Sequence, residues 1–149
     1  MASLLSRLCV AAFAAGVTLT AFAQSMSPVG LWQTIDDETK KAKSFVRITE
    51  KDGVISGKIE KIVDPAKQDS KCDECANDDP RKGKPVIGMT ILSDLKKDGD
   101  NVWSGGKILD PNKGSVYSAK VAVIEGGKKL EMTGSFLFIS RTQTWIRVE

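Results

Sequence analysis

Two cysteines three residues apart, Cys72 and Cys75, form the most reactive motif of the sequence. A Cys-x-x-Cys pair can serve as a thiol oxidoreductase site, as half of a metal site or as a short disulfide. A redox pair needs a lowered thiol pKa at a helix N-terminus, whereas Asp73 and Glu74 between these thiols would raise it. A metal site would need two further ligands, which without histidine must be aspartates such as Asp78. The motif therefore favours a structural disulfide over the other two readings.

Other residue combinations offer little catalytic chemistry. The sequence has no histidine, which excludes Ser-His-Asp and Cys-His catalysis and histidine-ligated haem or zinc. Ser93 and Lys96 match a Ser-x-x-Lys motif, but they fall at the end of an expected strand, and serine–lysine catalysis needs both on one helical turn. The acidic residues between 64 and 79 fit no EF-hand spacing, so a solvated acidic loop is expected. We predict no catalytic residues, no metal and no cofactor.

Residues 1–23 have the features of a secretory signal peptide. Arg7 precedes an uncharged run that begins at Leu8, and the segment ends in Ala21-Phe22-Ala23, an Ala-x-Ala cleavage pattern. The run is shorter than the roughly 20 apolar residues that a spanning helix needs. We expect cleavage after Ala23, removal of Cys9 with the signal, and a mature domain of residues 24–149 that does not span the membrane.

Short alternating strands separated by turns account for the mature chain. Asp52-Gly53, Asp110 to Gly114 and Gly126-Gly127 are turn signals, and the polar stretch 63–84 is expected to be a long loop. The expected strands are 30–35, 44–49, 54–62, 86–95, 102–109, 116–124, 130–138 and 141–148.

This pattern predicts an all-β fold, a single antiparallel eight-stranded up-and-down barrel. Nearly all strands are joined by short turns, which favours a barrel over a sandwich. Glycines such as Gly57, Gly105 and Gly134 recur inside strands, where a barrel can use them to bend sharply. The 22 basic and 19 acidic residues are interspersed without a basic stripe, so no nucleic-acid partner is expected.

Motifs near both ends and in the middle of the chain resemble a known family. They are Gly30-Leu31-Trp32, Gly83 to Met89, Trp103-x-Gly105-Gly106-x-Ile108-x-Asp110-Pro111 and Arg141 to Trp145. Together they resemble the bacterial exported family known as domain of unknown function 2147. This resemblance covers almost the whole mature chain. It implies a small exported protein with a lipocalin-like barrel and supplies no catalytic residues.

The lipocalin likeness also predicts how the barrel closes. In lipocalins a Gly-x-Trp on the first strand packs beneath an arginine from the last strand. Gly30 and Trp32 match the first half, and Arg141 or Arg147 can supply the second, with Arg141 taken as the candidate. Such a cation–π stack contributes about 1–2 kcal/mol when it is desolvated.

The barrel interior is where a ligand would bind. The expected inward side chains are Val46, Ile48, Ile55, Ile59, Met89, Tyr117, Val121, Met132 and Phe136. On the last strand, Arg141, Gln143, Trp145 and Arg147 share one face, and Thr142, Thr144, Ile146 and Val148 share the other. If the first face points inward, the pocket suits an amphipathic ligand with an acidic head. If the second face points inward, its side chains plug the barrel and the charged face lies in solvent. The candidate ligand-binding residues are Tyr117, Met132, Phe136, Arg141, Gln143 and Trp145.

These features predict a periplasmic or secreted bacterial protein that binds a small apolar or amphipathic molecule without catalysis. The alternative is a packed barrel that acts as an envelope interaction module through the 63–84 loop. A cavity that touches Tyr117, Met132, Trp145 and Arg141 would favour the first hypothesis, and a filled core with a protruding disulfide loop would favour the second. The sequence does not identify a protein partner.

Overall fold

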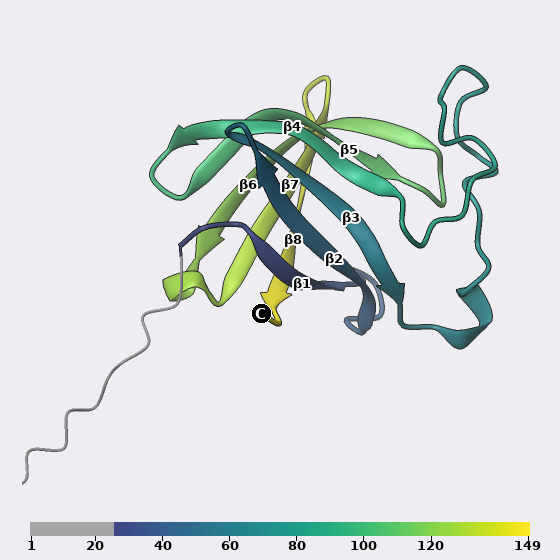
Figure 1. The fold of residues 1–149 in the computed structure, drawn as a ribbon, viewed down its shortest axis with the longest axis horizontal. Helices are drawn as coiled ribbons and strands as arrows, with labels where there is room; N and C mark the ends of the chain where they lie inside the picture. The colour runs from purple at the N-terminus through teal and green to yellow at the C-terminus, as the bar shows by residue number, and fades with distance from the viewer. Residues whose placement is uncertain (1–25) are drawn as a thin grey trace, which may run out of the picture.

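The structure is a computed structural model that describes residues 26–149. The predicted signal peptide, residues 1–23, lies outside the described residues. Eight strands pair in sequence order, all antiparallel, and β8 pairs with β1 to close the barrel (Figure 1). The strands are β1 (Gly30–Ile35), β2 (Ala42–Lys51), β3 (Val54–Ile62), β4 (Thr90–Gly99), β5 (Val102–Asp110), β6 (Ser115–Ile124), β7 (Lys129–Phe136) and β8 (Ile139–Arg147). The predicted fold class is confirmed.

The up-and-down order places alternate connections at opposite ends of the barrel. The closed end carries the β2–β3, β4–β5 and β6–β7 connections together with the C-terminus. The open end carries the β1–β2 turn (36–41), the long β3–β4 connection (63–89), the β5–β6 turn (111–114) and the β7–β8 turn (137–138). Two 3-10 helices, η1 (Pro65–Lys67) and η2 (Glu125–Gly127), lie in these connections.

Many of the fully buried core side chains lie toward the closed end of the barrel. Along each strand, successive side chains point to opposite faces of the sheet. The face that carries the apolar side chains points into the barrel. The largest fully buried side chains include Trp32, Ile48, Ile55, Leu95 and Leu130. Burying side chains of this size stabilises the fold by about 1.5–3 kcal/mol each.

Several expected strand ends are wrong, those of β2, β4, β7 and β8 by two residues or more at one end or both. Residues 86–89 belong to the β3–β4 connection, where Val86 and Met89 are nevertheless buried, and β4 instead runs on to Gly99. Strand β7 ends at Phe136, because the chain turns at Leu137, whose φ is +54°. Phe136 was expected to be buried, but its side chain is 60% exposed.

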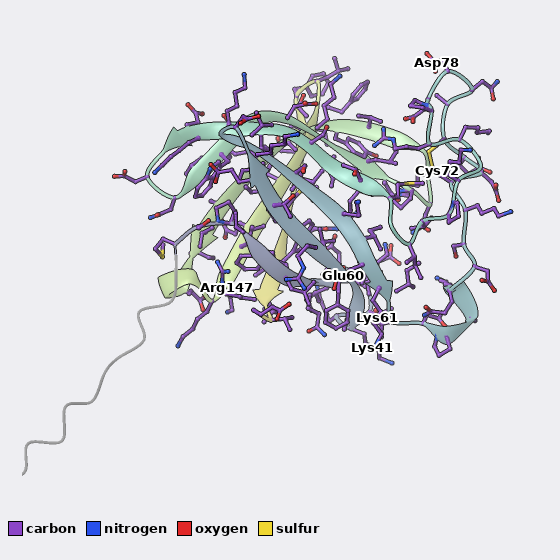
Figure 2. All side chains as sticks on the ribbon, in the orientation of Figure 1. Lys41, Glu60, Lys61, Cys72, Asp78 and Arg147 are labelled. Atoms are coloured by element: carbon purple, nitrogen blue, oxygen red, sulfur yellow. A yellow bond between two sulfur atoms is a disulfide. The ribbon has the colours of Figure 1, made fainter. Side chains whose placement is uncertain are left out.

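The β3–β4 connection projects from one side of the barrel and carries the disulfide between Cys72 and Cys75 (Figure 2). Both cysteines are buried, and their Cα atoms lie 5.3 Å apart. Backbone hydrogen bonds from Cys72 to Lys84 and from Gly83 to Cys72 fold the connection back on itself. The predicted disulfide is therefore present, and it belongs to an ordered loop.

Candidate functional site: a cavity at the open end of the barrel

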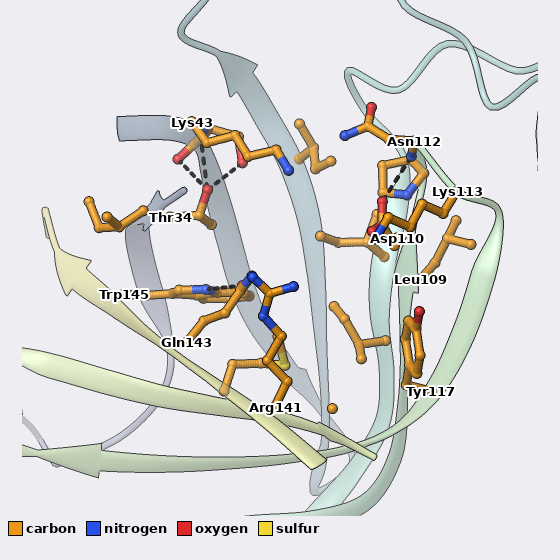
Figure 3. Close-up of a pocket in the computed structure, with 18 of the residues that line it drawn as sticks. Thr34, Lys43, Leu109, Asp110, Asn112, Lys113, Tyr117, Arg141, Gln143 and Trp145 are labelled. Atoms are coloured by element: carbon orange, nitrogen blue, oxygen red, sulfur yellow. Dashed lines mark hydrogen bonds between the residues drawn. The ribbon is translucent and has the colours of Figure 1, made fainter. Parts of the chain in front are cut away.

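A cavity of about 370 Å³ occupies the interior near the open end (Figure 3). This volume falls within the range of about 300–1,000 Å³ that is usual for small-molecule sites. The apolar part of its wall comes from several strands and includes Ile59, Ile91, Ile108, Leu109 and Met132. The barrel is thus hollow near its open end.

All six candidate ligand-binding residues line this cavity: Tyr117, Met132, Phe136, Arg141, Gln143 and Trp145. Trp145 is buried and Gln143 is half-buried, whereas Thr142 and Thr144 on the alternate face are exposed. The face of β8 that carries the guanidinium, amide and indole groups therefore points inward, and the plugged alternative is wrong. That these residues bind a ligand remains a prediction.

A chain of hydrogen bonds links the floor of the cavity to its mouth. The Trp145 Nε1–H donates to Gln143 Oε1 at 3.3 Å, and the Gln143 amide donates to Asp37 Oδ2 at 2.9 Å. The Arg141 guanidinium forms a salt bridge with the same Asp37 oxygen at 2.7 Å. Arg141 is therefore held at the mouth, with its side chain 61% exposed, by a carboxylate of the β1–β2 turn.

A second polar group stands in the adjoining wall, between β1 and β2, because β1 pairs with β8. The Thr34 and Ser44 hydroxyls are 2.7 Å apart, and the Ser44 backbone N–H donates to Thr34 Oγ1 at 3.1 Å. Both side chains are buried and line the cavity. Since their hydrogen bonds are satisfied within the protein, an apolar group can approach them without leaving a donor unpaired.

The mouth of the cavity is predominantly basic. Lys43, Lys113 and Arg141 line it, against two carboxylates: Asp37, which pairs with Arg141, and Asp110, whose Oδ1 accepts the Asn112 backbone N–H at 3.0 Å. A second hollow of about 300 Å³ between the β1–β2 turn and the long connection shares Lys43 and Asn112 with the cavity. The site therefore combines an apolar interior with cationic groups at its entrance.

Sequence reasoning missed several of these residues. Thr34 and Ser44 could have been found, because each is two positions from an inward residue, Trp32 and Val46 respectively. Asp37 and Lys113 lie in turns, where no periodicity indicates a direction. Their position depends on which turns meet at the open end, and this follows only from the closed barrel.

At the closed end, Trp32 and Arg147 form the predicted stack. The Arg147 guanidinium carbon lies 4.2 Å from the centroid of the Trp32 ring. Arg141 was the wrong candidate for this role, since it is six residues nearer the open end and pairs with Asp37. Gly30 is also part of the closure, because a Cβ there would collide with the backbone of Glu149 and approach Arg147.

Two chemical alternatives can be compared with this geometry. Within residues 26–149, no group of three or more cysteine or acidic side chains lies close enough to hold a metal ion. Ser93 and Lys96 both lie in strand β4, so they do not share the helical turn that serine–lysine catalysis needs.

None of the helices within residues 26–149 has the length and hydrophobicity to cross a bilayer.

An eight-stranded barrel that is closed at one end by a tryptophan–arginine stack and hollow at the other defines a lipocalin-like protein. Residues 30–147 match the family DUF2147, described as an uncharacterized protein conserved in bacteria, and the chain belongs to this family. The chain is also similar to protein HP1028 from the human pathogen Helicobacter pylori, described as belonging to the lipocalin family. The two are 29% identical with a TM-score of 0.73, over 84% of this chain and 85% of that one. Among curated proteins, none matches this chain significantly. The predicted family is confirmed.

Proposed function

We propose that this protein binds a small apolar or amphipathic molecule in the open half of its barrel and does not convert it chemically. The observation that carries the proposal is the cavity of about 370 Å³, with apolar walls and three cationic side chains at its mouth. An apolar tail would be desolvated against Ile59, Ile108 and Met132. An acidic head would remain near the entrance, where guanidinium and ammonium groups can donate charge-assisted hydrogen bonds.

We further propose that the protein works in the periplasm or outside the cell, after cleavage behind Ala23. The Cys72–Cys75 disulfide supports this location, because disulfides persist in oxidising compartments. The alternative function, an interaction module acting through residues 63–84, is less well supported. The loop does project from the barrel, but the interior is hollow, and a filled core was the feature expected of that alternative.

The test is to block the cavity without disturbing the barrel. Gly134 lines the cavity, and a Cβ built there would lie at ordinary contact distance, 3.5 Å, from Ile108 and Tyr117. The Gly134→Leu variant should therefore fold and fill part of the space. Ser118→Leu on the exposed surface of the neighbouring strand β6 is the matched control.

Binding is measured by titrating a fluorescent fatty acid into the protein recovered from the periplasm, and native mass spectrometry reports any co-purified ligand. We expect Gly134→Leu to weaken binding by at least about tenfold, since it removes contact with roughly two methylene groups or more of the ligand. Ser118→Leu should bind as the wild type does. A wild-type protein that binds no hydrophobic probe and is always recovered empty would refute the proposal.

A further inference from the structure

The β7–β8 turn and the strand residue on each side of it form a run of four consecutive exposed apolar residues. We call this run the apolar tip: Phe136, Leu137, Phe138 and Ile139. Their side chains are 60%, 81%, 92% and 67% exposed, in that order. A run of exposed apolar residues on a protein surface usually marks an interaction site, because moving each side chain out of water lowers the free energy. The tip projects beyond the neighbouring strands, as the yellow turn in Figure 1 shows.

The apolar tip is held in a defined shape by the hairpin beneath it. Phe136 pairs with Ile139 across the hairpin, and Ser135 pairs with Ser140. The Ser135 and Ser140 hydroxyls also form a hydrogen bond of 2.9 Å. Leu137 turns the chain with a φ of +54°. The tip is therefore presented with its backbone already ordered, which lowers the entropy lost when it binds.

The tip lies at the mouth of the cavity. Phe136 and Ile139 belong to the cavity wall, whereas Leu137 and Phe138, at the very end of the turn, do not. Lys43 and Lys113 belong to the same cavity and are exposed. Neither forms a salt bridge with any of residues 26–149, although hydrogen bonds from Thr39 and, to a lesser degree, the charge of Lys43 lower the pKa of Asp36, so both exposed amino groups can approach an anionic partner.

We propose that the apolar tip inserts into the headgroup layer of an anionic phospholipid bilayer and sets the cavity mouth against the lipid. Leu137 and Phe138 would enter the boundary between headgroups and acyl chains, where peripheral proteins place large apolar residues. Lys43 and Lys113 would lie near lipid phosphates and strengthen the binding to an anionic surface. A ligand could then pass between membrane and cavity without crossing open water.

A second copy of the chain is a weaker candidate for the partner. A stable protein interface buries about 800 Å² on each side. Four apolar side chains at about 150 Å² each fall short of this area even when they are wholly covered. A bilayer needs no complementary shape, so a narrow apolar tip with cationic neighbours fits it better. Membrane docking needs no ligand in the cavity, so it can hold or fail independently of the proposed function.

The experiment is cosedimentation with lipid vesicles. The protein is secreted from its full-length coding sequence, recovered from the periplasm, and checked by mass spectrometry so that every variant has the same N-terminus. Leu137→Ser combined with Phe138→Ser removes the outer half of the tip. Val148→Ser is the matched control, because Val148 is 51% exposed and lies next to the C-terminus at the closed end. Circular dichroism checks that each variant folds.

We expect the wild type to bind vesicles of phosphatidylglycerol and phosphatidylethanolamine, and the double tip variant to bind at least about tenfold more weakly. Val148→Ser should bind like the wild type. Lys43→Gln with Lys113→Gln should weaken binding to these vesicles about tenfold and leave binding to pure phosphatidylcholine unchanged. A Leu137→Trp variant should show a blue-shifted emission on binding.

Three results would overturn the proposal. The first is a wild type that does not sediment with anionic vesicles. The second is a folded double tip variant that binds them as strongly as the wild type. The third is a wild-type dimer in sedimentation velocity that the tip variant abolishes, since the tip would then be a self-association surface.

Discussion

Arg147 lies over Trp32, with its guanidinium carbon 4.2 Å from the centroid of the indole ring. The two residues are paired across the β1–β8 seam that closes the barrel. The Trp32 Nε1–H donates to the Pro28 carbonyl at 2.7 Å, so the ring is fixed at its edge as well as at its face. The stack therefore adds a side-chain contact to the backbone pairing that joins the first and last strands.

Replacing Arg147 with alanine should destabilise the barrel strongly. The guanidinium donates to the backbone carbonyls of Gly127, Val29 and Ser27, which connect the β6–β7 connection to the N-terminal segment. Loss of the stack and of these charge-assisted hydrogen bonds should lower the free energy of unfolding by about 2–4 kcal/mol. Urea denaturation of the wild type and the variant measures this difference.

Arg47→Ala is the control for this substitution. Arg47 pairs with Glu60 on the surface at 2.8 Å and contacts Glu149, and pairs of this exposed kind are worth about 0–1 kcal/mol. Arg147→Lys keeps the charge but cannot reproduce the planar fork, so it should recover less than half of the loss. Equal losses for Arg147→Ala and Arg47→Ala would show that the stack is not a closing element.

Gly114 joins two turns of the open end by close backbone contact. Its φ is +69°, and a Cβ there would overlap the Glu74 carbonyl and lie 2.7 Å from the Cys75 nitrogen. Gly114→Ala should therefore push the disulfide turn away from the β5–β6 turn and lower the free energy of unfolding by about 2–4 kcal/mol. Gly126→Ala is the control, since Gly126 has a similar φ of +65° and open space around it. Gly126→Ala should lower the free energy of unfolding by only about 1 kcal/mol, through backbone strain. Equal losses of stability at both positions would show that the contact between Gly114 and the disulfide turn does not matter.

The fold was predictable because local signals agree with the tertiary structure. Alternating residues such as Val46 and Ile48 indicate an inward face, and Asp52-Gly53 indicates the turn that follows. The faces of the last strand could not be oriented in this way. Both faces carry large side chains, and only the closure of β8 on β1 places Trp145 inside and Thr144 outside.

The sequence predicted residues of the cavity wall, but it did not predict the contacts at the cavity mouth. Tyr117 and Met132 follow from strand periodicity, and both line the cavity. The contact between Asp37 and Arg141 joins residues far apart in the chain, in a turn and a strand whose proximity no local pattern contains. Phe136 was misplaced for a similar reason, because the pattern continues through the turn although the barrel ends there.

Acid should weaken the long β3–β4 connection through Asp79. The Arg81 guanidinium, 2.7 Å from the Asp79 carboxylate, lowers the pKa of Asp79 to about 2, and Arg81 also donates to the Thr90 carbonyl. Because the folded pKa lies below the unfolded value near 3.9, this pair stabilises the protein above about pH 4 and the effect is lost as pH falls toward about 2. We expect Asp79→Asn to remove about 1 kcal/mol of this pH-dependent stability. Urea denaturation across this range checks the result, and a variant with the same acid dependence as the wild type would contradict it.

Asp37 should compete with an acidic ligand for Arg141. In the structure the Asp37 carboxylate forms a salt bridge with the Arg141 guanidinium at 2.7 Å and accepts a hydrogen bond from the Gln143 amide at 2.9 Å. Asp37→Asn would remove that charge and leave Arg141 free to bind a ligand carboxylate, so affinity for a fatty acid should rise several-fold while affinity for the corresponding fatty alcohol should not. Glu38→Gln makes the same charge change in the same turn and controls for the general field. Competition titrations with acid and alcohol of equal chain length measure the difference. If both substitutions raise the affinity for the acid equally, the effect is long-range charge, and Arg141 does not hold the head group.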